Sequence, residues 1–161
     1  MWRLFCASVL ISSLQGLRVE VAKNVILVGV KSVTLHEQSN VEMWDLHGNF
    51  YLTEANIGKN WAVPCCNKLQ ELNGVVTVYT LTSELTKEHI SCFQVVAFTD
   101  VTFRKTIQSN DFCRNHKPMI AFIKLDIRGL FGSVFCDFGP KFTIFDVNGK
   151  ERHTCILAKL L

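Results

Sequence analysis

The chain has 161 residues, of which 48% are hydrophobic and 19% charged, with a formal net charge of +3. This length and composition suit one globular domain with a substantial core and exclude an intrinsically disordered chain. The charge is small, and lysines and arginines never form a run, so the sequence does not indicate a nucleic-acid partner.

The seven cysteines are odd in number and mostly stand in apolar surroundings. There is no Cys-x-x-Cys pair, and the adjacent Cys65 and Cys66 have no histidine at ligand spacing. The five histidines form no pair at i and i+4. Neither a disulfide framework nor a metal site is therefore indicated. Reduced, buried cysteines predict a cytoplasmic and nuclear protein.

The N-terminal residues 1–14 place Arg3 before a short apolar run, which is the pattern of a signal peptide. The run lacks a small-residue cleavage motif and is too short to span a bilayer. A buried first strand is the better interpretation, and we expect no membrane partner.

Residues 8–28 predict a strand, a turn containing Gly16, and a helix over residues 17–28 that ends at Gly29. The helix is expected to bury Leu17, Val21, Val25 and Val28, with Ala22 and Ile26 beside them. A helix N-terminus after a buried strand is where a nucleotide-binding α/β fold places its phosphates.

Residues 32–36 predict the second strand, and Glu37 stands at its carboxyl end. In dinucleotide-binding folds an acidic residue at this position contacts a ribose hydroxyl. Gly16 and Glu37 are thus the two candidate nucleotide-binding residues, although a charged residue at a strand exit is common.

Residues 38–56 are polar and predict a long irregular connection anchored by Trp44, Phe50 and Tyr51. A helix is expected over residues 59–72, with Leu69 and Leu72 buried. Pro64 should begin this helix or kink it, because proline lacks the N–H of a helix interior.

The rest of the chain continues as alternating strands and helices. Residues 75–81 and 94–99 are apolar runs that predict strands covered on both faces, as in a parallel α/β sheet. A short helical piece separates them at residues 86–91. A helix over residues 103–115 should bury Ile107 and Phe112, and Asp100 is a candidate cap for the segment that precedes it.

After a fifth strand at residues 119–125 the pattern changes. Residues 131–138 and 142–147 are two strands separated by Gly139 and Pro140, and Asn148 with Gly149 gives a turn signal. No helix-length segment lies between them, so we expect them to pair as antiparallel strands.

Five phrases carry a specific resemblance, at residues 16–24, 29–36, 57–60, 69–73 and 128–139. In register over nearly the whole chain, they resemble the ubiquitin-activating enzyme family of eukaryotes, particularly its plant forms. The resemblance falls on the first, "inactive" adenylation repeat, of the ThiF and MoeB type. It implies an α/β, Rossmann-like, mostly parallel sheet with helices on both faces and an antiparallel C-terminal extension.

The resemblance also implies one domain over residues 1–161. Residues 1–128 would form its Rossmann-like part, and residues 129–161 antiparallel strands leading toward an absent catalytic-cysteine region. The complete family enzyme uses ATP and Mg to adenylate ubiquitin and then forms a thioester. This chain resembles only one repeat of that enzyme, so no cysteine here is assigned as catalytic, and no cofactor is assigned to the chain alone.

The departures from the family pattern predict a weakened nucleotide site. Where the family has a glycine-rich turn, Ser12 and Arg18 stand at what resemble the outer glycine positions, and Gly16 alone remains. Glycines there permit close approach of the backbone to phosphate. Trp61 stands where the first repeat commonly has an arginine, and we expect it on the surface or against a neighbour.

Two functional hypotheses remain open. The chain is an inactive member of the ubiquitin conjugation pathway, or it is the non-catalytic subunit of a heterodimeric enzyme that activates a ubiquitin-like modifier. A fragment of an intact enzyme is a variant of the second. In each case the expected partner is a second adenylation repeat or subunit, with ubiquitin or a ubiquitin-like modifier bound only by the complete assembly.

Overall fold

The computed structural model describes residues 2–12, 17–99, 101–144 and 153–155. The N-terminal half contains α1 (Trp2–Phe5), β1 (Ser8–Ser12), α2 (Leu17–Val28), β2 (Ser32–His36), the 3₁₀ helices η1 (Met43–His47) and η2 (Glu54–Asn56), α3 (Ala62–Gln70) and β3 (Thr77–Leu81). The C-terminal half contains α4 (Lys87–Ser91), β4 (Val95–Thr99), α5 (Phe103–Asn115), β5 (Ala121–Arg128), β6 (Phe131–Asp137), β7 (Phe142–Ile144) and β8 (His153–Cys155).

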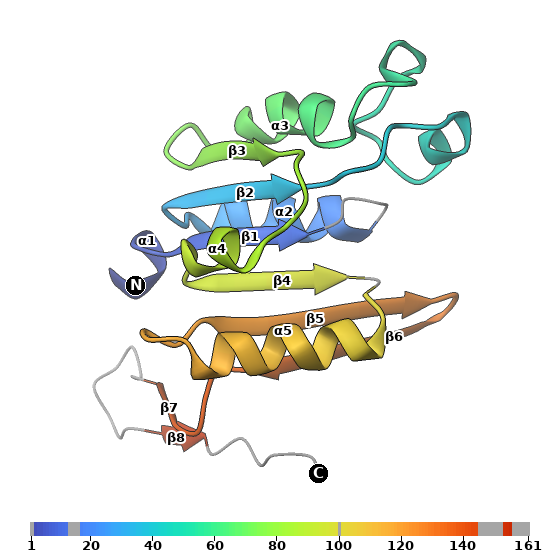
Figure 1. Cartoon of the computed structure of the whole chain (residues 1–161). Coiled ribbons are helices and arrows are strands. Elements are labelled where there is room, and N and C mark those ends of the chain that lie inside the picture. The colour runs from blue at the N-terminus through green and yellow to red at the C-terminus, as the bar shows by residue number, and fades with distance from the viewer. Residues whose placement is uncertain (1, 13–16, 100, 145–152, 156–161) are drawn as a thin grey trace.

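The main sheet has six strands in the order β3-β2-β1-β4-β5-β6 (Figure 1). The pairs from β3 to β5 are parallel, whereas β6 returns antiparallel to β5. The strand order reverses between β1 and β4. In open α/β sheets this reversal opens a crevice at the carboxyl ends of the strands, where ligands bind. The expected Rossmann-like architecture is confirmed.

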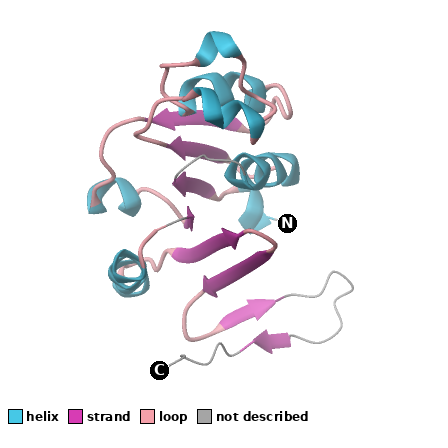
Figure 2. Ribbon diagram, turned by 90° about the vertical axis from the view of Figure 1, so that its right-hand side faces the viewer, coloured by secondary structure: helices cyan, strands magenta, loops and turns pink. Residues whose placement is uncertain are grey.

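Helices lie on both sides of the sheet, and each side has its own core (Figure 2). On one side Val9 and Ile11 of β1 pack with residues of α2 and α3. On the other side Leu10 packs with residues of β4, α4, α5 and β5. This alternation follows from the two-residue period of a strand and explains why the three central residues of β1, Val9 to Ile11, are all apolar.

The predicted bounds of α2, β2 and α5 are confirmed, whereas the expected buried faces of the two helices are confirmed only in part. Helix α2 buries Val19, Ala22 and Ile26, whereas Val28 is exposed. Ile107 of α5 and Leu72, which lies just after α3, are also exposed, contrary to expectation. The sheet covers only one strip of each helix, and its position decides which apolar side chains are buried. Pro64 lies in the first turn of α3, as expected.

The expected roles of the aromatic residues near the long connection are reversed. Trp44 and Phe50 are exposed rather than anchoring, and only Tyr51 packs against the core. Trp61, for which we expect a place on the surface or against a neighbour, is 1% exposed and lies in the core with α3. Its Nε1–H donates to Asp45 Oδ2 at 3.2 Å and so joins η1 to the body of the domain.

Strand β3 and two cysteines also differ from the sequence-based expectation. Strand β3 is the edge of the sheet, and its outer face is exposed rather than covered. Cys6 and Cys92 are exposed, whereas Cys65 and Cys113 are buried as expected. The six cysteines whose side chains the structure describes are free thiols. No helix among the described residues is long and apolar enough to cross a membrane.

The C-terminal strands pair differently from the expectation. Strand β6 forms a hairpin with β5 around Gly129, which has a positive φ of 60°. Strand β7 pairs antiparallel with β8 in a separate two-stranded sheet. The predicted pairing of residues 131–138 with 142–147 is therefore wrong, because each segment has a different antiparallel partner. The turn signal at Asn148 and Gly149 lies outside the described residues.

Candidate functional site

The crevice at the carboxyl ends of β1, β2 and β4 is the candidate functional site. Buried polar side chains gather at these strand ends, namely Ser12, His36, Glu37 and Thr99. Apolar strands end in polar residues here because the chain leaves the core at this edge. The sequence candidate Gly16 and the possible cap Asp100 lie outside the described residues.

Ser12 and His36 form a hydrogen-bonded pair across the ends of β1 and β2. They are partners in the parallel register, and Ser12 Oγ lies 3.0 Å from His36 Nδ1. His36 Nε2 lies 3.0 Å from the carbonyl oxygen of Ser83. Because a carbonyl only accepts, Nε2 carries the proton, and Nδ1 of the neutral ring accepts from the Ser12 hydroxyl.

Burial lowers the pKa of His36, against the opposing effects of the Ser83 carbonyl and of the Glu37 charge. The ring is therefore held in its neutral form. Thr99 Oγ1 donates to the carbonyl oxygen of Ser12 at 3.3 Å, which joins β4 to the same cluster. These contacts tie β1, β2, β4 and the segment before α4 together. Both ring nitrogens of His36 bond to protein atoms, so this cluster holds the strand ends in place.

Sequence reasoning did not identify the Ser12–His36 pair. The available signal was the equal length of the first two strands, since Ser12 and His36 are each the last residue of a five-residue strand. Two neighbouring parallel strands of equal length that begin in register also end in register. Such an alignment brings the two side chains together at the carboxyl edge of the sheet.

Glu37 is 7% exposed, and its carboxylate holds the turn that follows β2. Its Oε1 accepts from the backbone N–H groups of Gln38 and Ser39 at 2.9 and 3.1 Å, and from Ser39 Oγ at 2.8 Å. Its backbone oxygen accepts from Asn60 Nδ2 at 2.9 Å. A carboxylate oxygen with three donors is already satisfied by its own loop.

Oε1 of Glu37 is therefore engaged by the turn that follows β2. A ribose hydroxyl could bind to that oxygen only by displacing one of these donors. The described residues also contain no group of three His, Cys, Asp or Glu side chains that could hold a metal ion. The arrangement at Glu37 stabilises the turn that follows β2.

The chain is similar to known proteins in sequence and in fold. The sequence profile of the ThiF family matches residues 1–120, which include β1, α2, β2 and the candidate crevice. The chain belongs to the ThiF family. Among solved structures, the ThiF domain is similar to E. coli MccB bound to succinimide, with a TM-score of 0.70 and 17% sequence identity. That match covers 84% of this chain and 43% of MccB, and it shows a shared fold.

Among curated proteins the ThiF domain is similar to ubiquitin-activating enzymes. It is 59% identical to ubiquitin-activating enzyme E1 2 of Triticum aestivum over 157 residues, which are 98% of this chain and 15% of that protein. It is 59% identical to ubiquitin-activating enzyme E1 2 of Arabidopsis thaliana over 160 residues, which are 99% of this chain and 15% of that protein. It is 45% identical to human ubiquitin-like modifier-activating enzyme 1 over 94% of this chain and 14% of that protein.

These relatives confirm the resemblance to the ubiquitin-activating enzyme family that the sequence phrases indicated. The ThiF domain spans about 15% of the length of the plant relatives. It therefore corresponds to a small part of each of these relatives.

Proposed function

We propose that this ThiF domain is the supporting adenylation repeat of a ubiquitin-activating assembly, and that it does not adenylate ubiquitin alone. The observation that carries the proposal is the 59% identity to the wheat ubiquitin-activating enzyme over 98% of this chain but only 15% of that protein. A repeat of this kind belongs to the ubiquitin conjugation pathway, in the cytoplasm and nucleus.

Support for inactivity of the isolated domain comes from its candidate nucleotide site. Oε1 of the Glu37 carboxylate accepts hydrogen bonds from three donors of its own turn. Ser12 and Arg18 stand where the family resemblance has glycines, and Trp61 stands where it has an arginine. A phosphate needs close backbone N–H groups and a bidentate cation, and these substitutions weaken both. ATP and Mg would act at a site that the complete assembly supplies.

Support for a partner repeat comes from the β5–β6 hairpin. Ile127, Leu130, Phe131 and Val134 are all exposed there. The register places Ile127 and Val134 on one face of the hairpin and Phe131 on the other. Exposed apolar side chains of this kind mark a surface that another polypeptide covers. We propose that a second adenylation repeat, on the same chain or on another, packs on this hairpin. Ubiquitin or a ubiquitin-like modifier would bind only to that assembly.

The exposed apolar side chains of the β5–β6 hairpin also favour the alternative, a non-catalytic subunit of a heterodimeric activating enzyme. Pyrophosphate exchange into ATP, with and without ubiquitin, separates these possibilities. We expect no exchange by the purified chain and no ATP-dependent thermal shift. Exchange by the chain alone would refute the proposal. Exchange that appears only when the remainder of the wheat relative is added would support a working repeat or subunit. No exchange even in that mixture would indicate an inactive member of the pathway.

A matched pair of variants tests the hairpin surface in that reconstitution. Val134→Asp places a charge on the β5–β6 hairpin, where the side chain is 66% exposed. Val75→Asp places the same charge before β3 at the opposite edge of the sheet, where the side chain is 85% exposed. We expect Val134→Asp alone to abolish association. Equal loss in both variants would contradict the assignment of this surface.

A further inference from the structure

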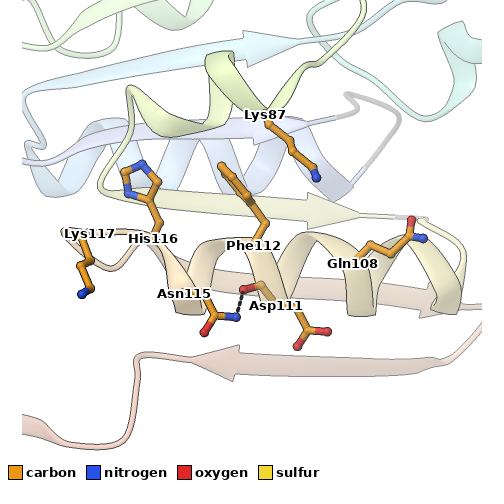
Figure 3. Close-up of a pocket in the computed structure, with 7 residues that line it drawn as sticks. All are labelled: Lys87, Gln108, Asp111, Phe112, Asn115, His116 and Lys117. Atoms are coloured by element: carbon orange, nitrogen blue, oxygen red, sulfur yellow. Dashed lines mark hydrogen bonds between the residues drawn. The ribbon is translucent and has the colours of Figure 1, made fainter.

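An open groove of about 850 Å³ lies between α4 and α5. Figure 3 shows its lining side chains, with Lys87 reaching from α4 and Phe112 and His116 projecting from α5 and the residue after it. None of its lining residues belongs to the cluster of Ser12, His36 and Glu37. The groove is therefore a separate feature from the candidate nucleotide site.

The central surface of the groove is aromatic and fixed in position. Phe112 is half-buried and packs against the core formed by β4, β5 and α5. The His116 ring lies 5.7 Å from it, between centroids, and Lys87 Nζ lies 5.7 Å from the Phe112 centroid. His116 Nδ1 donates to the Pro118 carbonyl at 2.8 Å, which fixes the ring and leaves Nε2 for another contact. A held aromatic surface suits an apolar side chain of a ligand.

Two lysines give the groove positive charge, Lys87 beside Phe112 and Lys117 beyond the end of α5 (Figure 3). Lys87 and Lys117 are both exposed, and in the part of the chain that the structure describes neither makes an ion pair. Asp111 is the one acidic side chain in the described lining. Two lysines against one aspartate leave a net positive groove, which complements an acidic ligand.

The groove's length and openness favour a peptide over a small molecule. Along α5 from Gln108 to Asn115 the helix rises about 10 Å, and Lys117 lies beyond the end of the helix. An extended peptide of about four or five residues covers that length. A drug-sized ligand would bury roughly 70–90% of its surface in a good site, which an open groove of this kind does not provide.

We propose that this groove binds an extended acidic segment of a partner protein. One apolar side chain of the segment packs on Phe112, and carboxylates on either side of it pair with Lys87 and Lys117. This inference is independent of the proposed function, because it uses no residue of the crevice or of the β5–β6 hairpin.

The probe is a fluorescein-labelled peptide of sequence Glu-Asp-Leu-Asp-Glu, titrated with the full chain and followed by anisotropy. We expect saturable binding that weakens as salt is raised, and no binding of the matched Lys-Lys-Leu-Lys-Lys peptide. Absence of saturable binding of the acidic peptide would overturn the proposal. So would competition by an oligonucleotide or anionic vesicles at lower concentration than the unlabelled peptide, because either would identify a different class of ligand.

Charge variants test whether the peptide binds in this groove. We expect Lys87→Glu and Lys117→Glu each to weaken binding about tenfold, and Asp111→Asn to strengthen it about twofold. Lys105→Glu is the matched control, because Lys105 is exposed on α5 but does not line the groove. Circular dichroism checks that each variant is folded. Equal weakening by Lys105→Glu, or no strengthening by Asp111→Asn, would overturn the assignment.

Discussion

Replacing Asp137 by asparagine tests how the last strand of the main sheet is fastened to α5. The Asp137 side chain is 6% exposed at the end of β6. Its Oδ2 accepts from Arg114 Nη1 at 2.6 Å and Asn110 Nδ2 at 3.1 Å, and its Oδ1 accepts from the Gly139 N–H at 2.9 Å. Asn110 and Arg114 both belong to α5, so one carboxylate joins helix and strand.

The size of the effect follows from these contacts. Asparagine keeps the shape of the aspartate side chain but replaces one acceptor oxygen with an NH₂ group. That group would face the donors of Arg114 and Asn110, or of Gly139. A hydrogen bond to a charged group contributes about 1.5–3 kcal/mol, and losing the partner of a buried charge costs more. Arg114 remains 31% exposed, so water screens the ionic part. We therefore expect Asp137→Asn to lower the free energy of unfolding by about 2–3 kcal/mol.

The pH dependence gives a second, independent signature. Burial of Asp137 opposes ionisation, but the hydrogen bonds from Gly139, Asn110 and Arg114, with the Arg114 charge, outweigh it and lower the pKa of the carboxyl. The stabilisation by the ionised Asp137 carboxylate is therefore complete above the ordinary aspartate pKa of about 4. It is lost as the pH falls through the lower pKa of the folded state.

Urea denaturation followed by tryptophan fluorescence measures both signatures. Wild type and Asp137→Asn should differ most near neutral pH and converge below about pH 4. Asp111→Asn is the matched control, because Asp111 is exposed on the same helix and should change stability by less than about 0.5 kcal/mol. A cost no larger than the control's, or a difference that persists unchanged into acid, would refute the reasoning.

Three further predictions concern the buried residues Trp61 and Cys113 and the strand-end residue His36. Trp61→Ala should lower the free energy of unfolding by about 3–5 kcal/mol, because it empties a buried site, whereas Trp44→Ala should be nearly neutral in the same urea titration. Because burial lowers the pKa of His36, the unfolded state takes up its proton first, so stability should fall as pH drops below about 6.5. His36→Gln should lose that slope in melts compared at pH 7.5 and 5.5. Burial and the nearby Asp137 charge raise the pKa of Cys113 to about 11, so iodoacetamide at pH 8 should label the exposed Cys92 and leave Cys113 unmodified in native protein, as mass spectrometry can show.

Local signals in the sequence were sufficient to place the elements of this fold. Helix α2 ends at Gly29, which has a φ of 86°, and the predicted bounds at Leu17 and Val28 are confirmed. Apolar runs without polar alternation predicted strands buried on both faces, and β1 and β4 are of this kind. Strand β3 was predicted from the same kind of run but lies at the sheet edge. Its position depends on strand order, which no local pattern encodes.

The candidate site was only partly accessible to sequence reasoning. Glu37 was recognised from its place after β2, and it does lie buried at the carboxyl edge of the sheet. That its carboxylate is held by Gln38 and Ser39 depends on the path of the loop, which the sequence does not specify. Its assignment as a nucleotide-binding residue, with Gly16, remains a prediction. The groove beside Phe112 depends on the packing of α4 against α5 and had no sequence signature.

By itself the sequence determined the family, the α/β class and the positions of the main helices and strands, because these follow from local propensity and from residues matched in register. Tertiary structure alone decided which side chains are buried. Trp61 is enclosed and Trp44 is not, although both are tryptophans in the same part of the chain. The difference arises because α3 and its neighbours close around one position and leave the other in water, and burial is a property of all the surrounding elements together.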